Sequence, residues 1–200
     1  MLKKLTRRMQ KSKSGIVKTD AEIEIMKTAG MICAQALKAV LANVKVGVSC
    51  KELDNIAHLE INNRKAQPSF MTVEDYKYTI CTTINEQVVH GIPTGRMLRN
   101  GDILGIDIGA LYKGYHSDLA ISVPVGKINK DKKKFLKICE DTLNMAIKKA
   151  KIGGYIGDIS STIQESIEGA GYSIVKNLTG HGVGHELHED PMIPGFGKPK

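Results

Sequence analysis

The stretch GDILGIDIGALYKGYHSDLAISVPVG, residues 101–126, predicts the element around which the rest of the chain is arranged. Two runs rich in β-forming residues flank Lys113-Gly114, a pair suited to a tight turn. The alternation of side-chain types within each run is typical of strands. We therefore expect a β-hairpin that turns near Lys113-Gly114 and places the two runs side by side.

Two aspartates in this hairpin are the first candidates for chemistry. Asp107 lies among apolar neighbours on the first run, and Asp118 lies on the return run, so folding about the turn brings them close together. Two neighbouring carboxylates in an apolar wall repel each other, and they share a proton unless a cation neutralises them. A pair of divalent metal ions suits this arrangement. Taken alone, Asp107 fits equally well as a hydrogen-bonded residue at a strand end.

The segments before the hairpin predict two helices followed by strands. Thr19-Asp20-Ala21-Glu22 has the form of a capping box and begins a predicted helix over about 20–43. A second box, Ser49-Cys50-Lys51-Glu52, begins a helix that ends near residue 63. The run YKYTICTTI, residues 76–84, then predicts a strand.

The segments after the hairpin repeat this order. Apolar residues at helical spacing predict helices over about 132–151 and 158–168, with Asp158 as the cap of the second, and residues 171–175 predict a strand. The expected class is α+β, with a helix-helix-strands unit that occurs twice. The second copy stops soon after its strands begin, so we expect it to be incomplete and the chain to be truncated.

Three histidines lie close together in TGHGVGHELHEDP, residues 179–191. The intervening glycines argue against a helical zinc motif, because glycine costs about 1 kcal/mol inside a helix. Glycines on both sides of His181 allow the close backbone approach that a ligand in a tight site requires. His188 lies on a segment expected to be extended, and for His185 we expect a structural or surface role.

Two further histidines lie at or near predicted strands. His90, in NEQVVHGIPTG, follows a β-run and precedes a Gly-Ile-Pro turn, so its ring is expected to face a cleft and contact substrate. The alternative is an ordinary loop histidine with its hydrogen bonds satisfied. His116 shares the strand parity of Asp118, and we expect it to support the site or to lie at its rim.

Composition limits the class of protein. The 200 residues suit one domain or slightly more, and a quarter of them are charged. No apolar run approaches the roughly 20 residues that span a bilayer, and the basic start has no hydrophobic signal segment. The four cysteines are scattered without C-x-x-C spacing, which favours reduced thiols. We expect a soluble cytoplasmic protein without membrane or DNA partners.

The basic charge is concentrated at the start of the chain. Residues 1–18 contain seven lysines and arginines and no acid, and removing them from the formal net charge of +8 leaves +1. We expect residues 1–18 to form a disordered basic tail and residues 19–200 to form the catalytic domain. The tail is either a solvated extension or an arm attracted to an anionic surface such as ribosomal RNA.

Five dispersed motifs together resemble one known family. They are IMKTAG, TTINEQVVHGIP, GDILGIDIGALYKGYHSD, TGHGVG and LHEDP, and they occur in the order found in methionine aminopeptidases of the bacterial type I kind. The resemblance covers nearly all of the chain beyond the tail. It implies the pita-bread fold, with its pseudo-twofold repeat, and removal of the initiator methionine from nascent proteins that have a small second residue. It also implies a monomer that uses two divalent metal ions, and Co, Mn, Fe and Zn all remain candidates for their identity.

The resemblance also implies a role for each matching residue. Asp107 would chelate one metal, Asp118 would bridge both, and His181 would be the histidine ligand. His90 and His188 would contact the substrate and stabilise the scissile carbonyl when hydroxide from the dinuclear centre attacks it. The pocket for the methionine side chain would be lined by Tyr76, Cys81 and Phe70.

Several departures leave alternatives open. Two glutamate ligands expected farther along the family's sequence have no counterpart before Lys200, and residues 68–78 differ from the commoner family version. The chain is therefore either part of an active enzyme or an inactive truncated form. A non-catalytic peptide-binding or ribosome-binding protein on the same fold is the other class. Proline-directed aminopeptidases and dipeptidases usually carry a large preceding domain, which about 18 residues do not provide.

Overall fold

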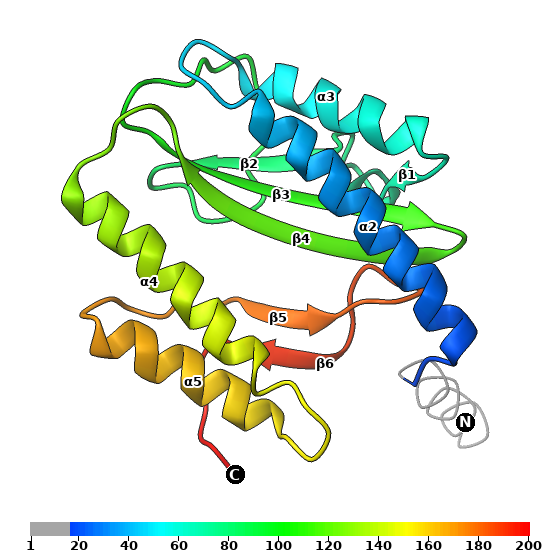
Figure 1. Cartoon of the computed structure of the whole chain (residues 1–200), viewed down its shortest axis with the longest axis vertical. Coiled ribbons are helices and arrows are strands. Elements are labelled where there is room, and N and C mark those ends of the chain that lie inside the picture. The colour runs from blue at the N-terminus through cyan, green and yellow to red at the C-terminus, as the bar shows by residue number, and fades with distance from the viewer. Residues whose placement is uncertain (1–16) are drawn as a thin grey trace. The chain divides into compact units, whose positions relative to one another are not determined.

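The structure is a computed structural model that describes residues 17–200 (Figure 1). The disorder expected for the basic tail concerns residues 1–16, which lie outside the described part, and its attraction to RNA stays a prediction. The described residues form two compact units. Unit 1 contains residues 17–127 and 183–189, and unit 2 contains residues 128–182 and 190–200.

The described part of unit 1 has two helices followed by a small antiparallel sheet. Its elements are α2 (Asp20–Ala42), α3 (Cys50–Asn63), β1 (Gln67–Pro68), a 3-10 turn (Phe70–Thr72), β2 (Ile80–Ile84), β3 (Ile103–Tyr112) and β4 (Tyr115–Pro124). Strand β3 pairs with each of the other three strands. The predicted hairpin is confirmed, and both turn residues have left-handed backbones, with φ of 49° at Lys113 and 82° at Gly114.

Both predicted capping boxes are confirmed. The N–H of Thr19 donates to the Glu22 carboxylate at 2.7 Å, and the Thr19 hydroxyl accepts from the N–H of Glu22 at 3.4 Å. Ser49 and Glu52 make the same reciprocal pair at the start of α3. Each box satisfies N–H groups that the first turn of a helix leaves without an intrahelical partner.

The hydrophobic core of unit 1 lies between the two helices and one face of the sheet. Residues at alternate positions of β3 are buried there, and they pack with the inner faces of α2 and α3: Leu104, Ile106, Ile108 and Ala110. Because side chains alternate along a strand, the intervening positions of β3 point away from these helices. Asp107 is one of them.

Helix α2 corrects one expectation from the sequence. Its 23 residues have a mean hydropathy that passes the length and composition test for a membrane span, although no such run was expected. One face of α2 is buried, including Ala29, Cys33, Ala36 and Val40, and packs against β3 and β4 (Figure 1). The apolar residues of α2 therefore have a partner inside the protein.

Unit 2 repeats the order of helix, helix and strands. It contains α4 (Lys130–Ile147), α5 (Ile156–Gly169) and β5 (Thr179–Gly182), and β5 pairs with β6 (Glu189–Pro194). Asn129 caps α4, because its side chain accepts the N–H of Lys132 at 2.9 Å. The predicted second helix is present, but Asp158 is not its cap. It is the third residue of α5, in the first turn, and its carboxylate accepts the N–H of Tyr155 at 3.1 Å.

Two predicted strands are wrong in whole or in part. No strand forms over residues 171–175, since Gly171 and Tyr172 donate their N–H groups to the last carbonyls of α5 and so end that helix. The predicted strand 76–84 shortens to Ile80–Ile84. Tyr76 turns back instead, with its N–H bonded to the Val73 carbonyl and its hydroxyl donating to the Ile80 carbonyl at 2.8 Å.

Candidate metal centre

The two aspartates of the hairpin share the face of the sheet that points away from α2 and α3. Asp118 pairs in register with Gly109, and Asp107 stands two residues away on the same strand as Gly109. This diagonal relation places both carboxylates on one face, and they are close enough to share a hydrogen bond. Burial, and after it the charge of Asp118, raises the pKa of Asp107 to about 7. A divalent cation in place of the shared proton would stabilise such a pair, because it would neutralise the repulsion between the two carboxylates.

Glycines on both sides of Asp107 allow the strands to approach closely. A Cβ at Gly109 would stand 2.7 Å from the Ser117 carbonyl oxygen and 2.7 Å from the Ser69 Cβ. A Cβ at Gly105 would stand 2.3 Å from the Thr83 hydroxyl. Any other residue at these positions forces its neighbours to move. The two glycines therefore help to fix the surroundings of the carboxylates.

His116 lies on the same face as Asp118, two residues before it on β4. It is buried, and its Nδ1 lies 3.0 Å from the Ser69 hydroxyl oxygen. Burial lowers its pKa despite the opposing charges of Glu186, Glu189 and Asp118, so the ring is neutral near pH 7. These contacts agree with the expected supporting role.

The three residues predicted to line a pocket come together beside Asp107. Phe70 and Cys81 form a buried cluster against which Tyr76 packs, and the Phe70 and Tyr76 rings are 6.5 Å apart. Cys81 pairs in register with Asp107, so its side chain lies on the face of the carboxylates. Burial raises the pKa of Cys81 to about 11, which keeps the thiol neutral and apolar. The cluster has the chemistry of a pocket for an apolar side chain, and its role in binding stays a prediction.

Leu187 is a member of this cluster that the sequence did not single out. It is 8% exposed and packs with Phe70 and Cys81, although it comes from the segment after β5. The sequence feature that could have identified Leu187 is its position directly before His188. Burial of Leu187 connects the segment that carries His188 to the predicted pocket.

His90 lies beside β2 in a strained backbone conformation. Its φ is 54°, which is unusual for a residue other than glycine, and its side chain is exposed. The following residue, Gly91, accepts a hydrogen bond from the Thr82 N–H at 2.7 Å. A Cβ at Gly91 would stand 2.0 Å from the Thr82 carbonyl oxygen, so only glycine allows this approach.

Replacing Gly91 with alanine should therefore displace His90 and lower activity. The added methyl group would push the segment away from β2 and break its bond to Thr82. We expect the kcat for release of an N-terminal residue to fall about a hundredfold, the cost of a misplacement of about 1 Å at a reacting centre. Gly95→Ala is the matched control, since nothing lies within 4 Å of that position. Equal activity of the two variants would contradict the assignment of His90.

The remaining predicted residues, His188 and His181, belong to different units. His188 follows Leu187 in unit 1 and is exposed. His181 lies on β5 in unit 2, where its Nδ1 donates to the Gly182 carbonyl at 2.9 Å and its side chain lines an apolar cavity of about 510 Å³. In the neutral ring this bond leaves the lone pair on Nε2, the atom suited to bind a metal.

Among residues 17–200, no group of three or more His, Cys, Asp or Glu side chains is assembled as a metal site. The structure brings Asp107 and Asp118 together, and the assignment of His181 rests on its sequence motif. The paired carboxylates nevertheless fit a divalent cation, because such a cation would remove the repulsion that raises the pKa of Asp107.

The chain is similar in sequence and in structure to known metallopeptidases. Residues 24–200 match the model of metallopeptidase family M24. Methionine aminopeptidase 1 of Bacillus subtilis is 45% identical over 184 residues, which cover 92% of this chain and 74% of that protein. The crystal structure of a methionine aminopeptidase from Thermotoga maritima has a TM-score of 0.90 at 37% identity and covers 92% of this chain and 75% of its own. Prolidase from Pyrococcus furiosus has a TM-score of 0.83 at 27% identity, with 94% and 54% covered.

Proposed function

Because this chain belongs to metallopeptidase family M24, we propose that it is a metal-dependent methionine aminopeptidase, which removes the N-terminal methionine from peptides. One observation carries this proposal. The Asp107–Asp118 pair and the apolar cluster of Phe70, Tyr76 and Cys81 meet on one face of the sheet, where Cys81 stands next to Asp107. A metal-binding pair is thus adjacent to a pocket of the right chemistry for a methionine side chain.

The metal ligands in this proposal are Asp107, Asp118 and His181. Carboxylate and imidazole groups accept Mn, Fe, Co and Zn, so the residues do not select among these ions. Two divalent ions, when bound, supply Lewis acidity and lower the pKa of water. The chain contributes the carboxylates, which one face of the sheet holds together, and the Nδ1–H bond of His181, which directs Nε2 toward coordination.

The substrate residues in this proposal are the pocket cluster and two histidines. The thioether of an N-terminal methionine would lie against Phe70 and Tyr76, since sulfur makes favourable contacts with aromatic rings. His90 and His188 would donate hydrogen bonds to the scissile carbonyl as negative charge develops on its oxygen. A small second residue in the substrate follows from the resemblance.

The prolidase likeness offers a second candidate, but the sequence favours methionine as the substrate. The Bacillus enzyme shares 45% identity with this chain, whereas the Pyrococcus prolidase shares 27%. We place the enzyme in the cytoplasm, where nascent chains carry their initiator methionine, and we propose that it acts as a monomer.

Release of free methionine from Met-Ala-Ser tests the proposal. We expect the purified protein to be active with an added divalent ion, inactive after dialysis against a chelator, and active again when Mn, Co, Fe or Zn is restored. Acetylated Met-Ala-Ser, which lacks the free amine, should not be cleaved, and neither should Ala-Pro, a prolidase substrate. Turnover that survives the chelator, or no methionine release with any of the four ions, would contradict the proposal.

A further inference from the structure

The segment Val183–Glu189, here called the strap, carries His188 but has no regular secondary structure before Glu189. Backbone bonds attach it to the start of β4, where the N–H of His116 donates to the Gly184 carbonyl at 2.7 Å. Within the strap, the N–H of Gly184 donates to the Glu186 carbonyl at 3.1 Å. The bond to His116 lies at the end of the strap that is farther from His188.

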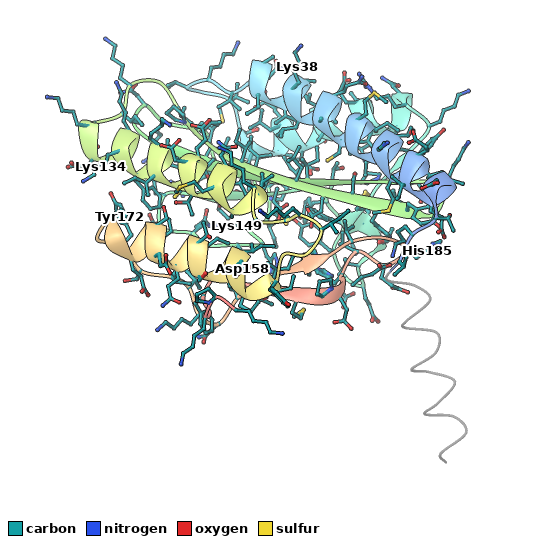
Figure 2. The ribbon with its side chains drawn as sticks, turned by 60° about the horizontal axis from the view of Figure 1, so that its bottom comes forward. Lys38, Lys134, Lys149, Asp158, Tyr172 and His185 are labelled. Carbon is teal, nitrogen blue, oxygen red and sulfur yellow. The ribbon has the colours of Figure 1, made fainter. Side chains whose placement is uncertain are left out.

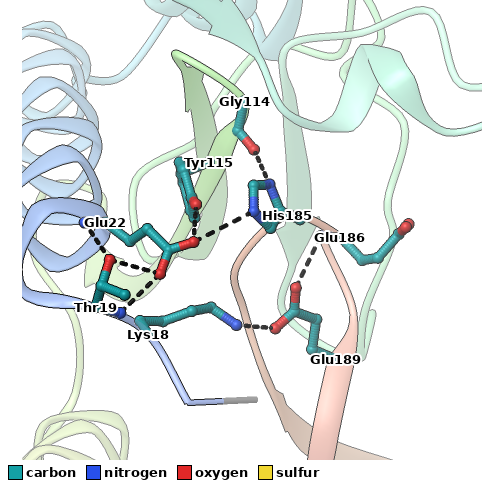
Figure 3. Close-up of polar contacts among 8 residues, drawn as sticks. All are labelled: Lys18, Thr19, Glu22, Gly114, Tyr115, His185, Glu186 and Glu189. Atoms are coloured by element: carbon teal, nitrogen blue, oxygen red, sulfur yellow. Dashed lines mark hydrogen bonds and ion pairs between the residues drawn. The ribbon is translucent and has the colours of Figure 1, made fainter. Parts of the chain in front are cut away.

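A nearly buried ion pair adds a second attachment at the end nearer to His188. Lys18 Nζ lies 2.6 Å from Glu189 Oε2, and the two side chains are only 10% and 13% exposed (Figure 3). The second oxygen, Oε1, accepts the N–H of Glu186 at 3.0 Å. Glu189 therefore connects Lys18, two residues before α2, to the backbone of the strap. Removing one partner of an ion pair so well shielded from water leaves an unpaired buried charge, which strongly destabilises the folded structure around it.

Gly184 shows that this pair packs directly against the strap. A Cβ at Gly184 would stand 2.5 Å from Glu189 Oε2 and 2.6 Å from Lys18 Cε. The third glycine of GHGVG, Gly184, thus leaves room for the ion pair. Lys18 was predicted to belong to the disordered basic tail, whereas in the structure it pairs with Glu189, 171 residues away.

A second cluster holds the middle of the strap to the first turn of α2. The hydroxyl of Tyr115 donates to Glu22 at 2.5 Å, and His185 Nε2 lies 3.7 Å from the same carboxylate (Figure 3). The His185 ring lies 4.1 Å from the Tyr115 ring, and its Nδ1 donates to the Gly114 carbonyl at 3.0 Å. His185 has the structural role expected for it. Figure 2 labels His185 near the start of the blue helix α2.

We propose that Lys18 and Glu189 form a clamp that positions His188. The clamp holds one end of the strap, the Glu22–Tyr115–His185 cluster holds its middle, and Leu187 packs into the cluster of Phe70 and Cys81. With both neighbours of His188 fixed, its ring faces the substrate rather than sampling solvent. Lys18 and Glu189 are positioning residues, and only the effect on turnover rests on the proposed function.

Two measurements on the full chain test the clamp. Lys18→Met should speed amide hydrogen exchange of peptides covering 183–189 by at least about tenfold, because the strap loses one attachment. Exchange over α3 should not change, which separates this local effect from general destabilisation. For Met-Ala-Ser, kcat should fall about tenfold or more with KM nearly unchanged, since His188 acts on the carbonyl and not on the methionine side chain.

Glu189→Gln should reproduce both effects, and combining it with Lys18→Met should add little to either, because each single variant already breaks the same attachment. Lys27→Met is the matched control, since its partner Glu24 and Lys27 itself are 69% and 66% exposed. The clamp is overturned if Lys18→Met and Lys27→Met show the same hydrogen exchange over residues 183–189. Its effect on turnover is overturned if the unaltered protein is active and the two variants have the same kcat. If the unaltered protein releases no methionine, the proposed function fails, while faster exchange in Lys18→Met still supports the clamp.

Discussion

Asp118→Asn is expected to abolish most of the activity while leaving the fold intact. Asparagine has the shape of aspartate but lacks its charge, so the pair with Asp107 becomes a poor ligand for divalent metal ions. Loss of groups that merely support a metal ligand costs about 10-fold to 100-fold in affinity or activity, so loss of a ligand itself should exceed about 100-fold in kcat/KM. Calorimetric titration with Mn²⁺ should show a comparable loss of affinity.

The melting temperature distinguishes loss of metal binding from loss of the fold. Because the substitution removes the charge that raises the pKa of Asp107, the metal-free variant should melt no lower than the metal-free parent protein. Asp131→Asn, an exposed position in the first turn of α4, is the matched control and should keep full activity. Metal affinity and turnover of Asp118→Asn within twofold of the parent protein would exclude this residue as a ligand.

Leu104→Ala is expected to have the largest effect on stability. Leu104 is fully buried on the face of β3 that packs with α2 and α3, and alanine would leave a cavity in this core. Comparable Leu→Ala substitutions lower the free energy of unfolding by about 2–5 kcal/mol. The loss of unfolding free energy is measured by urea unfolding of the metal-free protein, with hydrogen exchange of the unit 1 amides as the probe.

The same substitution at Leu59 provides the comparison. Leu59 is 61% exposed on α3, and alanine favours helix, so the free energy of unfolding should change by less than about 0.5 kcal/mol. Below its unfolding temperature, Leu104→Ala should keep measurable activity, because Asp107 points to the opposite face of β3. Equal unfolding free energies for the two variants would show that the core does not lie where the structure places it.

Local signals made much of unit 1 predictable. The capping boxes at Thr19 and Ser49 and the Lys113-Gly114 turn each involve residues within three positions of one another, so the sequence contains all that they require. Once the turn is known, the strand period of two puts Asp107 and Asp118 on one face, which the register confirms. The family followed from five dispersed motifs, one of which is this hairpin.

The secondary-structure predictions were wrong where another contact competes with the local sequence pattern. Residues 171–175 are rich in β-formers, yet the bonds of Gly171 and Tyr172 to the end of α5 prevent a strand. Asp158 precedes a helical pattern and looks like a cap, but its carboxylate bonds back to Tyr155 from inside the helix. In each case, hydrogen bonds at one end of α5 override the conformation that the local pattern predicts.

The sequence by itself determined the family, the hairpin and the identity of the two carboxylates, because these depend on local pairing and on motifs of fixed spacing. Only the tertiary structure showed that Leu187 joins Phe70 and Cys81, and that Lys18 pairs with Glu189 from a position counted in the tail. Those contacts join residues far apart in the chain, and the burial that makes them strong exists only after the fold has excluded water. The periodicity of a sequence does not predict which distant residues become buried together.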